Sequence, residues 1–229
     1  MDYASCMDIQ VYRLENNRPH DYGGPLERPF EPLEPLLDSL PLYRLIERHA
    51  EVFADKPAVV TPERVLTFGE LRALALGYCS ALMPHLRQGE IIRPVFCLSA
   101  DSCVQVAVAL ACWRLGFAHA PLDPDMPAAR CRDLVRAARD PVVVAEPGQA
   151  ERMELAETGA AVVDASLDVR DREPRLPAFP SSATAGSIVF TSGSTGEPKG
   201  IVHSQSAIAR QMAAKVRNGW SAPKRWSTF

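Results

Sequence analysis

The sequence lacks several features that would assign a protein of this size to a class at once. It has no apolar run near the roughly 18 residues that a membrane-spanning helix needs, and its N-terminus, with Asp2 and Asp8, has no apolar segment typical of a signal peptide. It also lacks an excess of basic charge, because the formal net charge is -3 at pH 7, whereas nucleic-acid-binding domains usually carry a basic face. We therefore expect a cytoplasmic protein that binds neither membranes nor nucleic acid.

The cysteines form no CxxC pair of the kind that binds metals or carries out redox chemistry. Several lie inside apolar stretches, where a free thiol behaves as a small hydrophobic side chain. We predict buried, reduced thiols rather than a metal site, and the six cysteines are Cys6, Cys79, Cys97, Cys103, Cys112 and Cys131.

The chain does have enough apolar residues for a substantial core. It contains 229 residues, of which 47% are hydrophobic and 23% are charged. Residues 1–35 are rich in proline, glutamate and arginine without a helical or strand period, so we expect an extended or poorly ordered arm. Between 36 and 229, short apolar runs alternate with amphipathic segments of about 10 to 15 residues. This alternation predicts an α/β fold, with a mainly parallel sheet flanked by helices.

Local signals mark the ends of several elements. Thr67 and Glu70 have the spacing of a capping box and predict the start of a helix. Ser102 with Gln105 has a similar spacing and predicts a second, largely buried helix that ends at Gly116.

Three other segments lead to less direct predictions. The run PAVVT, residues 57–61, predicts a short buried strand. The run IIRPVFCLS, residues 91–99, predicts a strand at a sheet edge or with a bulge, because Pro94 cannot donate a ladder hydrogen bond. Residues 148–159 predict one helix closed by Gly159.

The stretch FTSGSTGEPKG, residues 190–200, follows the apolar residues Ile188 and Val189. Clusters of glycine, serine and threonine are often turns or linkers. However, a glycine-rich turn between a strand and a helix can direct backbone N–H groups at an anion. Neither GxxxxGK[ST] nor GxGxxG is present, which excludes the Walker A loop and the dinucleotide fingerprint. The candidate anion-binding residues are three glycines, four hydroxyl residues and one lysine: Gly193, Gly196, Gly200, Thr191, Ser192, Ser194, Thr195 and Lys199.

This stretch resembles the phosphate-loop signature of the adenylate-forming (AMP-binding) superfamily. Two upstream segments are similar to further elements of that family, in the expected order: LTFGEL at 66–71 and RLGFAHAPLDPDMPAAR at 114–130. The second is closest to amino-acid adenylation domains. It departs from them mildly, because Arg114 and Leu115 replace the usual Lys-Ala pair, and His119 and Ala120 replace an aromatic and an aliphatic residue.

The resemblance implies the first half of the large N-terminal domain of an ATP-dependent ligase. Such an enzyme activates a carboxylic acid, with an amino acid favoured, as an acyl-AMP, and then transfers the acyl group to a thiol of CoA or a carrier protein. Thr191, Ser192, Gly193, Ser194, Thr195, Gly196, Lys199 and Gly200 would then bind the ATP phosphates, with Mg2+ sharing their charge.

The family's later motifs, for adenine, ribose and the second catalytic lysine, do not occur in these residues. We therefore expect the chain alone to bind ATP phosphates weakly at most and not to adenylate, and we consider a complementary C-terminal half as a partner. The alternatives are a noncatalytic interaction module or one half of a split enzyme. A phosphotransferase with an unusual phosphate loop is disfavoured, because no residues supply its base or metal carboxylates.

Overall fold

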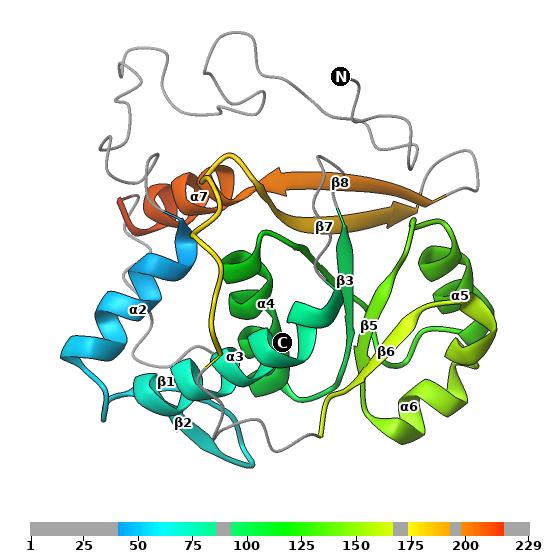
Figure 1. The fold of residues 1–229 in the computed structure, drawn as a ribbon, viewed down its shortest axis with the longest axis horizontal. Helices are drawn as coiled ribbons and strands as arrows, with labels where there is room; N and C mark the ends of the chain where they lie inside the picture. Colours follow the sequence, from blue (N-terminus) through cyan, green and yellow to red (C-terminus); the bar gives the residue numbers. More distant parts are fainter. Residues whose placement is uncertain (1–40, 86–92, 167–173, 193–197, 218–229) are drawn as a thin grey trace, which may run out of the picture.

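A six-stranded sheet forms the centre of the computed structural model, which describes residues 41–85, 93–166, 174–192 and 198–217 (Figure 1). The strand order is β6-β5-β3-β4-β7-β8. All neighbouring strands run parallel except β7 and β8, which form an antiparallel hairpin at one edge. The predicted α/β class is confirmed, and the strands are β3 (Pro94–Leu98), β4 (Ala118–Pro121), β5 (Val142–Ala145), β6 (Ala161–Asp164), β7 (Ala185–Ser192) and β8 (Pro198–Ser204).

Helices cover both faces of this sheet, so its central strands are buried on both sides. On one face, Val95 and Cys97 pack with α2 (Leu42–Val52), α3 (Phe68–Leu82) and α4 (Ser102–Leu115). On the other, Phe96 and Leu98 pack with α5 (Ala128–Arg136) and the short 3-10 helix η3 (Leu155–Thr158). This alternation follows from strand geometry, in which successive side chains point to opposite faces.

Pro94 does not lie on an edge strand, contrary to the sequence-based expectation. It is the first residue of β3, which lies between β4 and β5 in the interior of the sheet. A proline is tolerated at the first residue of a strand, where its missing N–H removes little of the ladder.

The segment PAVVT does not join the buried sheet either. It contributes β1 (Pro57–Val60), which pairs with β2 (Val65–Thr67) in a separate two-stranded antiparallel sheet. Val60 and Val65 are opposite each other in this pairing, and both are exposed. The prediction of a buried strand was therefore wrong, because an apolar run of four residues does not determine what covers it.

The helix starts were predicted only in part. Thr67 caps α3 with a complete capping box, in which Thr67 Oγ1 accepts from the Glu70 N–H and Glu70 Oε2 accepts from the Thr67 N–H. The cap of α4 is Asp101 rather than Ser102, because the Asp101 carboxylate accepts a 2.7 Å hydrogen bond from the Cys103 N–H. The predicted end of α4 at Gly116 is confirmed by its left-handed backbone, with φ of 84°.

Residues 148–159 form two short helices instead of one. The first is α6 (Pro147–Arg152), and η3 follows it. Glu154 lies between them with a positive φ of 53°, a conformation that ends an α-helix. The predicted stop at Gly159 is present, with φ of 72°.

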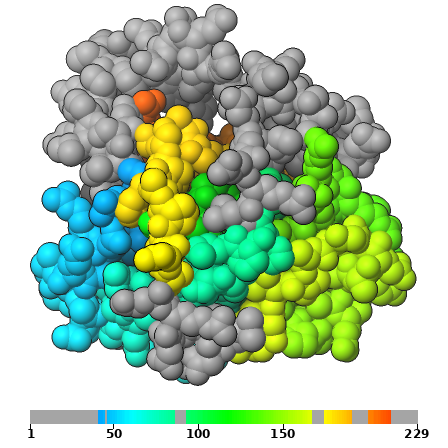
Figure 2. All heavy atoms as spheres, in the orientation of Figure 1, coloured from blue at the N-terminus to red at the C-terminus, as the bar shows by residue number. Residues whose placement is uncertain are grey.

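The connection before the hairpin crosses the outside of the α3 and α4 layer. Figure 2 shows its described part in yellow, beside α2 in blue. Leu176 and Phe179 pack against the apolar cluster that α3 and α4 form with the sheet. Arg114 of α4 donates a 2.8 Å hydrogen bond from Nη2 to the Pro177 carbonyl, and its guanidinium lies 4.0 Å from the centre of the Phe179 ring. The residue that departs from the family pattern at position 114 thus fixes this crossing.

Candidate functional site

The candidate phosphate loop joins the two strands of the β7–β8 hairpin. Thr191 and Ser192 are the last residues of β7, and Pro198, Lys199 and Gly200 begin β8. The backbone register places Thr191 opposite Lys199 and Ser192 opposite Pro198. Four of the eight candidate residues therefore lie at the mouth of one turn, while Gly193, Ser194, Thr195 and Gly196 lie outside the described residues.

A helix does not follow this loop directly, contrary to the strand, turn and helix order expected from the sequence. The seven-residue strand β8 comes first, and α7 (Gln205–Arg217) begins only after it. The Ser204 hydroxyl accepts from the Ala207 N–H at 3.1 Å, which places the start of the helix at the far end of β8. The N-terminus of α7 is therefore separated from the loop by the whole length of β8. The run Ile201 and Val202 was the available signal for a strand.

Gly200 has a packing role that the sequence did not suggest. A Cβ atom at this position would lie 3.1 Å from Ile188 Cγ2 and 3.3 Å from Phe190 Cε1. Phe190 itself stacks on Phe96 of β3, with 5.9 Å between ring centres and 17° between ring planes. The glycine thus lets β8 lie close to the aromatic pair that holds the hairpin on the sheet. Its contact with a ligand stays a prediction.

The opposite end of the hairpin is held by a buried glutamine that the sequence did not single out. The Gln205 side chain is fully buried. Its Oε1 accepts a 3.1 Å hydrogen bond from the Leu42 N–H, and its Nε2 donates a 2.9 Å hydrogen bond to the Trp113 carbonyl. The Trp113 indole in turn donates from Nε1 to the Gly186 carbonyl at 2.8 Å. No sequence pattern reveals these partners, because they come from α2, α4 and β7.

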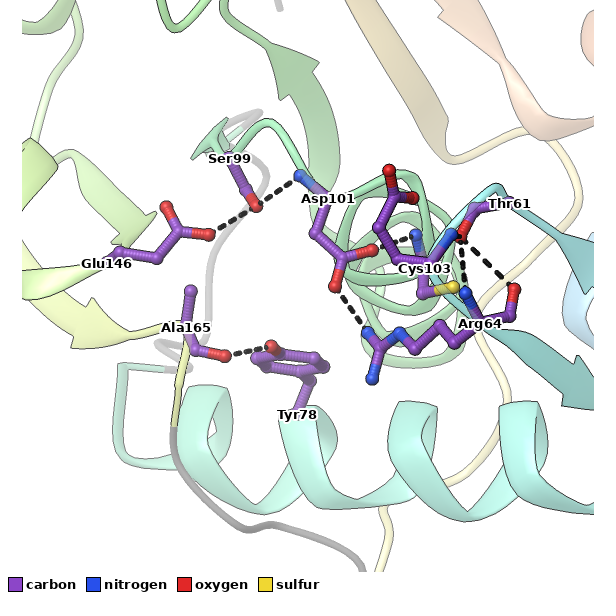
Figure 3. A network of polar contacts seen from close by, with 9 residues as sticks. Thr61, Arg64, Tyr78, Ser99, Asp101, Cys103, Glu146 and Ala165 are labelled. Carbon is purple, nitrogen blue, oxygen red and sulfur yellow. Dashed lines mark hydrogen bonds and ion pairs between the residues drawn. The ribbon is translucent and has the colours of Figure 1, made fainter. Parts of the chain in front are cut away.

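A second polar network lies at the carboxyl ends of β3 and β5 (Figure 3). The Ser99 hydroxyl donates a 2.5 Å hydrogen bond to Glu146 Oε1 and accepts from the Asp101 N–H at 3.1 Å. Asp101 also forms a 2.5 Å ion pair with Arg64, which ties the β1–β2 turn to the start of α4. The described residues contain no group of three or more His, Cys, Asp or Glu side chains that could hold a metal ion. This network joins neighbouring loops and caps a helix.

Burial sets the protonation of the remaining candidate groups. His119 in β4 is 8% exposed, and burial lowers its pKa from 6.5 to about 4, so this imidazole is neutral at pH 7. Burial likewise raises the pKa of Cys97 to about 12 and that of Cys112 well above its ordinary value. The prediction of buried thiols is confirmed for Cys79, Cys97, Cys103, Cys112 and Cys131, whereas Cys6 lies outside the described residues. Such thiols are unreactive at neutral pH.

The chain is similar in sequence and in fold to several known proteins. The family model described as AMP-binding enzyme matches residues 46–227. Nonribosomal peptide synthetase fmqA of Aspergillus fumigatus is 32% identical over 174 residues, which cover 73% of this chain and 4% of that protein. Malpinin synthetase of Mortierella alpina is 29% identical over 184 residues, covering 79% of this chain and 2% of that protein. The chain thus spans a few per cent of the length of these relatives.

Solved structures show the same fold at lower identity. The nonribosomal peptide synthetase FmoA3 matches with a TM-score of 0.70 and 22% identity, covering 82% of this chain and 19% of FmoA3. VinN, solved with 3-methylaspartate, matches with a TM-score of 0.67 and 20% identity, covering 80% of this chain and 53% of VinN. Among the helices in the described ranges, none has both the length and the apolarity to cross a membrane.

Proposed function

Because the chain belongs to the family of AMP-binding enzymes, we propose that it forms the N-terminal part of an adenylate-forming ligase. The observation that supports this most directly is the β7–β8 hairpin, whose register brings Thr191 and Lys199 opposite each other at a glycine-rich turn. In the proposed reaction a substrate carboxylate oxygen attacks the α-phosphorus of ATP. The bond from that phosphorus to the bridging oxygen breaks, and pyrophosphate leaves with the bonding electron pair.

The role proposed for this chain is to bind the phosphates that become pyrophosphate. Negative charge grows on the leaving group as the bond breaks, so a fixed cation and aligned N–H and hydroxyl donors stabilise it. In this proposal Lys199 supplies the cation, the four hydroxyl residues Thr191, Ser192, Ser194 and Thr195 supply hydroxyls, and Gly193 and Gly196 supply backbone N–H groups.

Magnesium is compatible with these residues, since hydroxyl oxygens and phosphate oxygens are the hard ligands that Mg2+ prefers. Bound there, Mg2+ would share the phosphate charge. In this proposal Lys199 and the loop hydroxyls hold and orient the phosphates.

An amino acid is the carboxylic acid that we propose for the complete enzyme. VinN is described in complexes with 3-methylaspartate and with L-aspartate, and FmoA3 with α-methyl-L-serine-AMP. The curated relatives include several nonribosomal peptide synthetases. These similarities support the substrate class, and the particular amino acid is left open.

The test is a calorimetric titration of the purified chain with pyrophosphate and with MgATP. We expect Lys199→Ala to weaken both at least tenfold, about 1.4 kcal/mol, because the loop loses its cation. Lys56→Ala is the matched control, since Lys56 is an exposed lysine before β1, with its Nζ 4.4 Å from the Phe53 ring. Absence of binding to the unaltered chain, or equal affinity in the two variants, would overturn the proposed phosphate site.

The chain by itself is expected to give no ATP–pyrophosphate exchange with a panel of amino, aryl and fatty acids. The reason is that its residues include none of the family's later motifs for ribose and for the second lysine. Exchange above background in the purified chain, abolished by Lys199→Ala, would show that these 229 residues are sufficient for adenylation.

A further inference from the structure

The structure points to Gln205 as a positioning residue: we propose that it fixes the direction of the β7–β8 hairpin and so the place of the loop at its tip. The consequence for ATP rests on the proposed function, whereas the effect on the hairpin does not. Gln205 is 0% exposed, although a neutral amide is costly to bury unless its donor and acceptor are both paired. Both are paired here, and each partner belongs to a different helix.

The two partners of Gln205 are backbone groups at helix ends. Leu42 is the first residue of α2, and the preceding residue, Pro41, has no side chain that could cap the helix, so the Leu42 N–H needs an acceptor from elsewhere. Trp113 lies in the last turn of α4, where the N–H groups of Gly116 and Phe117 both bond to the Cys112 carbonyl instead. The Gln205 side-chain amide therefore provides a hydrogen-bond partner for a carbonyl at the end of α4 and for an N–H at the start of α2. Its position is set by both helices.

The base of the hairpin is joined to α4 through both strands. On the β8 side, Gln205 donates its side-chain amide to Trp113. On the β7 side, the carbonyl of Gly186 accepts from the Trp113 indole, at a point where the register between the strands is irregular. The backbone N–H of Gln205 also donates to the Thr184 carbonyl at 2.9 Å. Trp113 and Gln205 thus connect the two strand ends to each other and to the helix layer.

Toward the loop, the hairpin has fewer directional attachments among the described residues. The ladder between β4 and β7 contains one register pair, His119 with Ser187, which is close to the base. Strand β8 is the edge of the sheet. The stacking of Phe190 on Phe96 resists movement away from the sheet, but aromatic packing is weakly directional compared with hydrogen bonds. At the base, the hydrogen bonds of Gln205 and Trp113 oppose a swing of the hairpin in the plane of the sheet.

The length of β8 makes the angle at the base important. From Gln205 to Pro198 is seven residues, or about 23 Å at about 3.3 Å per residue in a strand. A change of about 5° at the base would shift the tip by about 2 Å. Misplacement of a binding group by about 1 Å can already reduce rates about 100-fold. The hydrogen bonds of Gln205 are thus placed where small angular errors have their largest effect on the loop.

Hydrogen–deuterium exchange on the full chain tests the effect on the hairpin without a ligand. Gln205→Leu removes both hydrogen bonds, and Gln205→Glu keeps the acceptor for Leu42 but loses the donor to Trp113. We expect amides of β7 and β8 to exchange at least tenfold faster in Gln205→Leu, with a smaller increase in Gln205→Glu. Val163→Ala is the control for general destabilisation, because Val163 is 6% exposed on β6, at the opposite edge of the sheet. Equal hairpin exchange in Gln205 and Val163 variants of similar melting temperature would overturn the inference.

Titration with pyrophosphate then separates positioning from simple loss of folded protein. Loss of folded protein lowers the number of binding sites per chain, whereas a misplaced loop raises Kd at an unchanged number of sites. We expect Gln205→Leu to raise Kd at least tenfold with the number of sites unchanged, and Val163→Ala to leave Kd unchanged. If Gln205→Leu does not fold, Gln205→Glu and Trp113→Phe supply the same comparison. An unaltered chain that binds no pyrophosphate would overturn the proposed function, and the exchange data alone would then decide the inference on Gln205.

Discussion

The indole of Trp113 in α4 donates a 2.8 Å hydrogen bond to the carbonyl oxygen of Gly186 in β7, across 73 positions of sequence. The bond reaches the hairpin at the position where its strand register is irregular. It joins the helix layer to the strand that leads into the candidate phosphate loop.

Replacing Trp113 by phenylalanine keeps an aromatic ring but removes this donor. We expect a loss of about 1 to 3 kcal/mol in the free energy of unfolding, because the Gly186 carbonyl loses its partner. Urea denaturation followed by circular dichroism measures it. Val106→Ala is the control on the same helix, at a partly exposed position, with an expected effect within about 0.5 kcal/mol. A Trp113→Phe variant as stable as Val106→Ala would contradict the prediction.

Replacing Gly186 by alanine tests the close contact between β7 and the start of α7. A Cβ atom there would lie 2.7 Å from Ile208 Cδ1 and 3.1 Å from the backbone nitrogen of Gln205. The Ile208 side chain can move, but the backbone atom cannot do so without shifting the helix. We expect a loss of about 1 to 3 kcal/mol in the free energy of unfolding.

Gly148→Ala is the matched control for this substitution. Gly148 lies in α6, and a Cβ atom there has no other atom within 4 Å. Alanine at that position is expected to stabilise the protein by about 0.5 to 1 kcal/mol, because glycine is unfavourable in a helix. Thermal unfolding of the two variants should shift in opposite directions, and a shift of both in the same direction would count against the packing argument.

Replacing Thr67 by alanine removes the capping box of α3. The hydroxyl of Thr67 accepts from the Glu70 N–H at 3.2 Å. Without this hydroxyl the Glu70 N–H, which lies in the first turn, has no hydrogen-bond partner within the helix. We expect a loss of about 1 kcal/mol in the free energy of unfolding, measured by urea denaturation. Glu70→Gln should be nearly neutral, because a glutamine oxygen can still accept from the Thr67 N–H. The argument fails if Glu70→Gln costs more than Thr67→Ala.

Acidification should weaken the fold through His119. Its pKa is about 4 in the folded chain and 6.5 as the ordinary value, so the unfolded state takes up a proton first as the pH falls. The contribution of neutral His119 to the free energy of unfolding is therefore fully present above pH 6.5 and is lost as the pH decreases toward 4. Between pH 7.5 and pH 5 the loss from this one group is about 2 kcal/mol.

The His119→Gln variant should lose this part of the pH dependence. Urea denaturation at several pH values between 4.5 and 7.5 measures the difference from the unaltered chain. His203→Gln is the control, because His203 in β8 is exposed. Parallel curves for His119→Gln and the unaltered chain would show that His119 is not the titrating group.

Much of the fold was predictable because its signals are local. The capping box at Thr67 and the glycine stop at Gly116 depend on contacts within a few residues, and both are present. Other predictions failed where the deciding contact was distant. Pro94 lies in an interior strand, and PAVVT pairs with a neighbouring hairpin strand rather than the main sheet.

The candidate site shows the same division between short-range and long-range information. The amino-acid sequence alone identified the family, because residues 190–200 resemble its phosphate-loop signature and the family model matches residues 46–227. The phosphate contacts of Thr191, Gly193 and Lys199 stay a prediction. Only the tertiary structure decided that a strand rather than a helix follows the loop. It also decided that Gln205 and Trp113 hold the far end of the hairpin. These contacts join residues up to 163 positions apart. The side chains of Gln205 and Trp113 bond to backbone groups, which almost every residue carries, so no residue type in the sequence indicates where the partners lie.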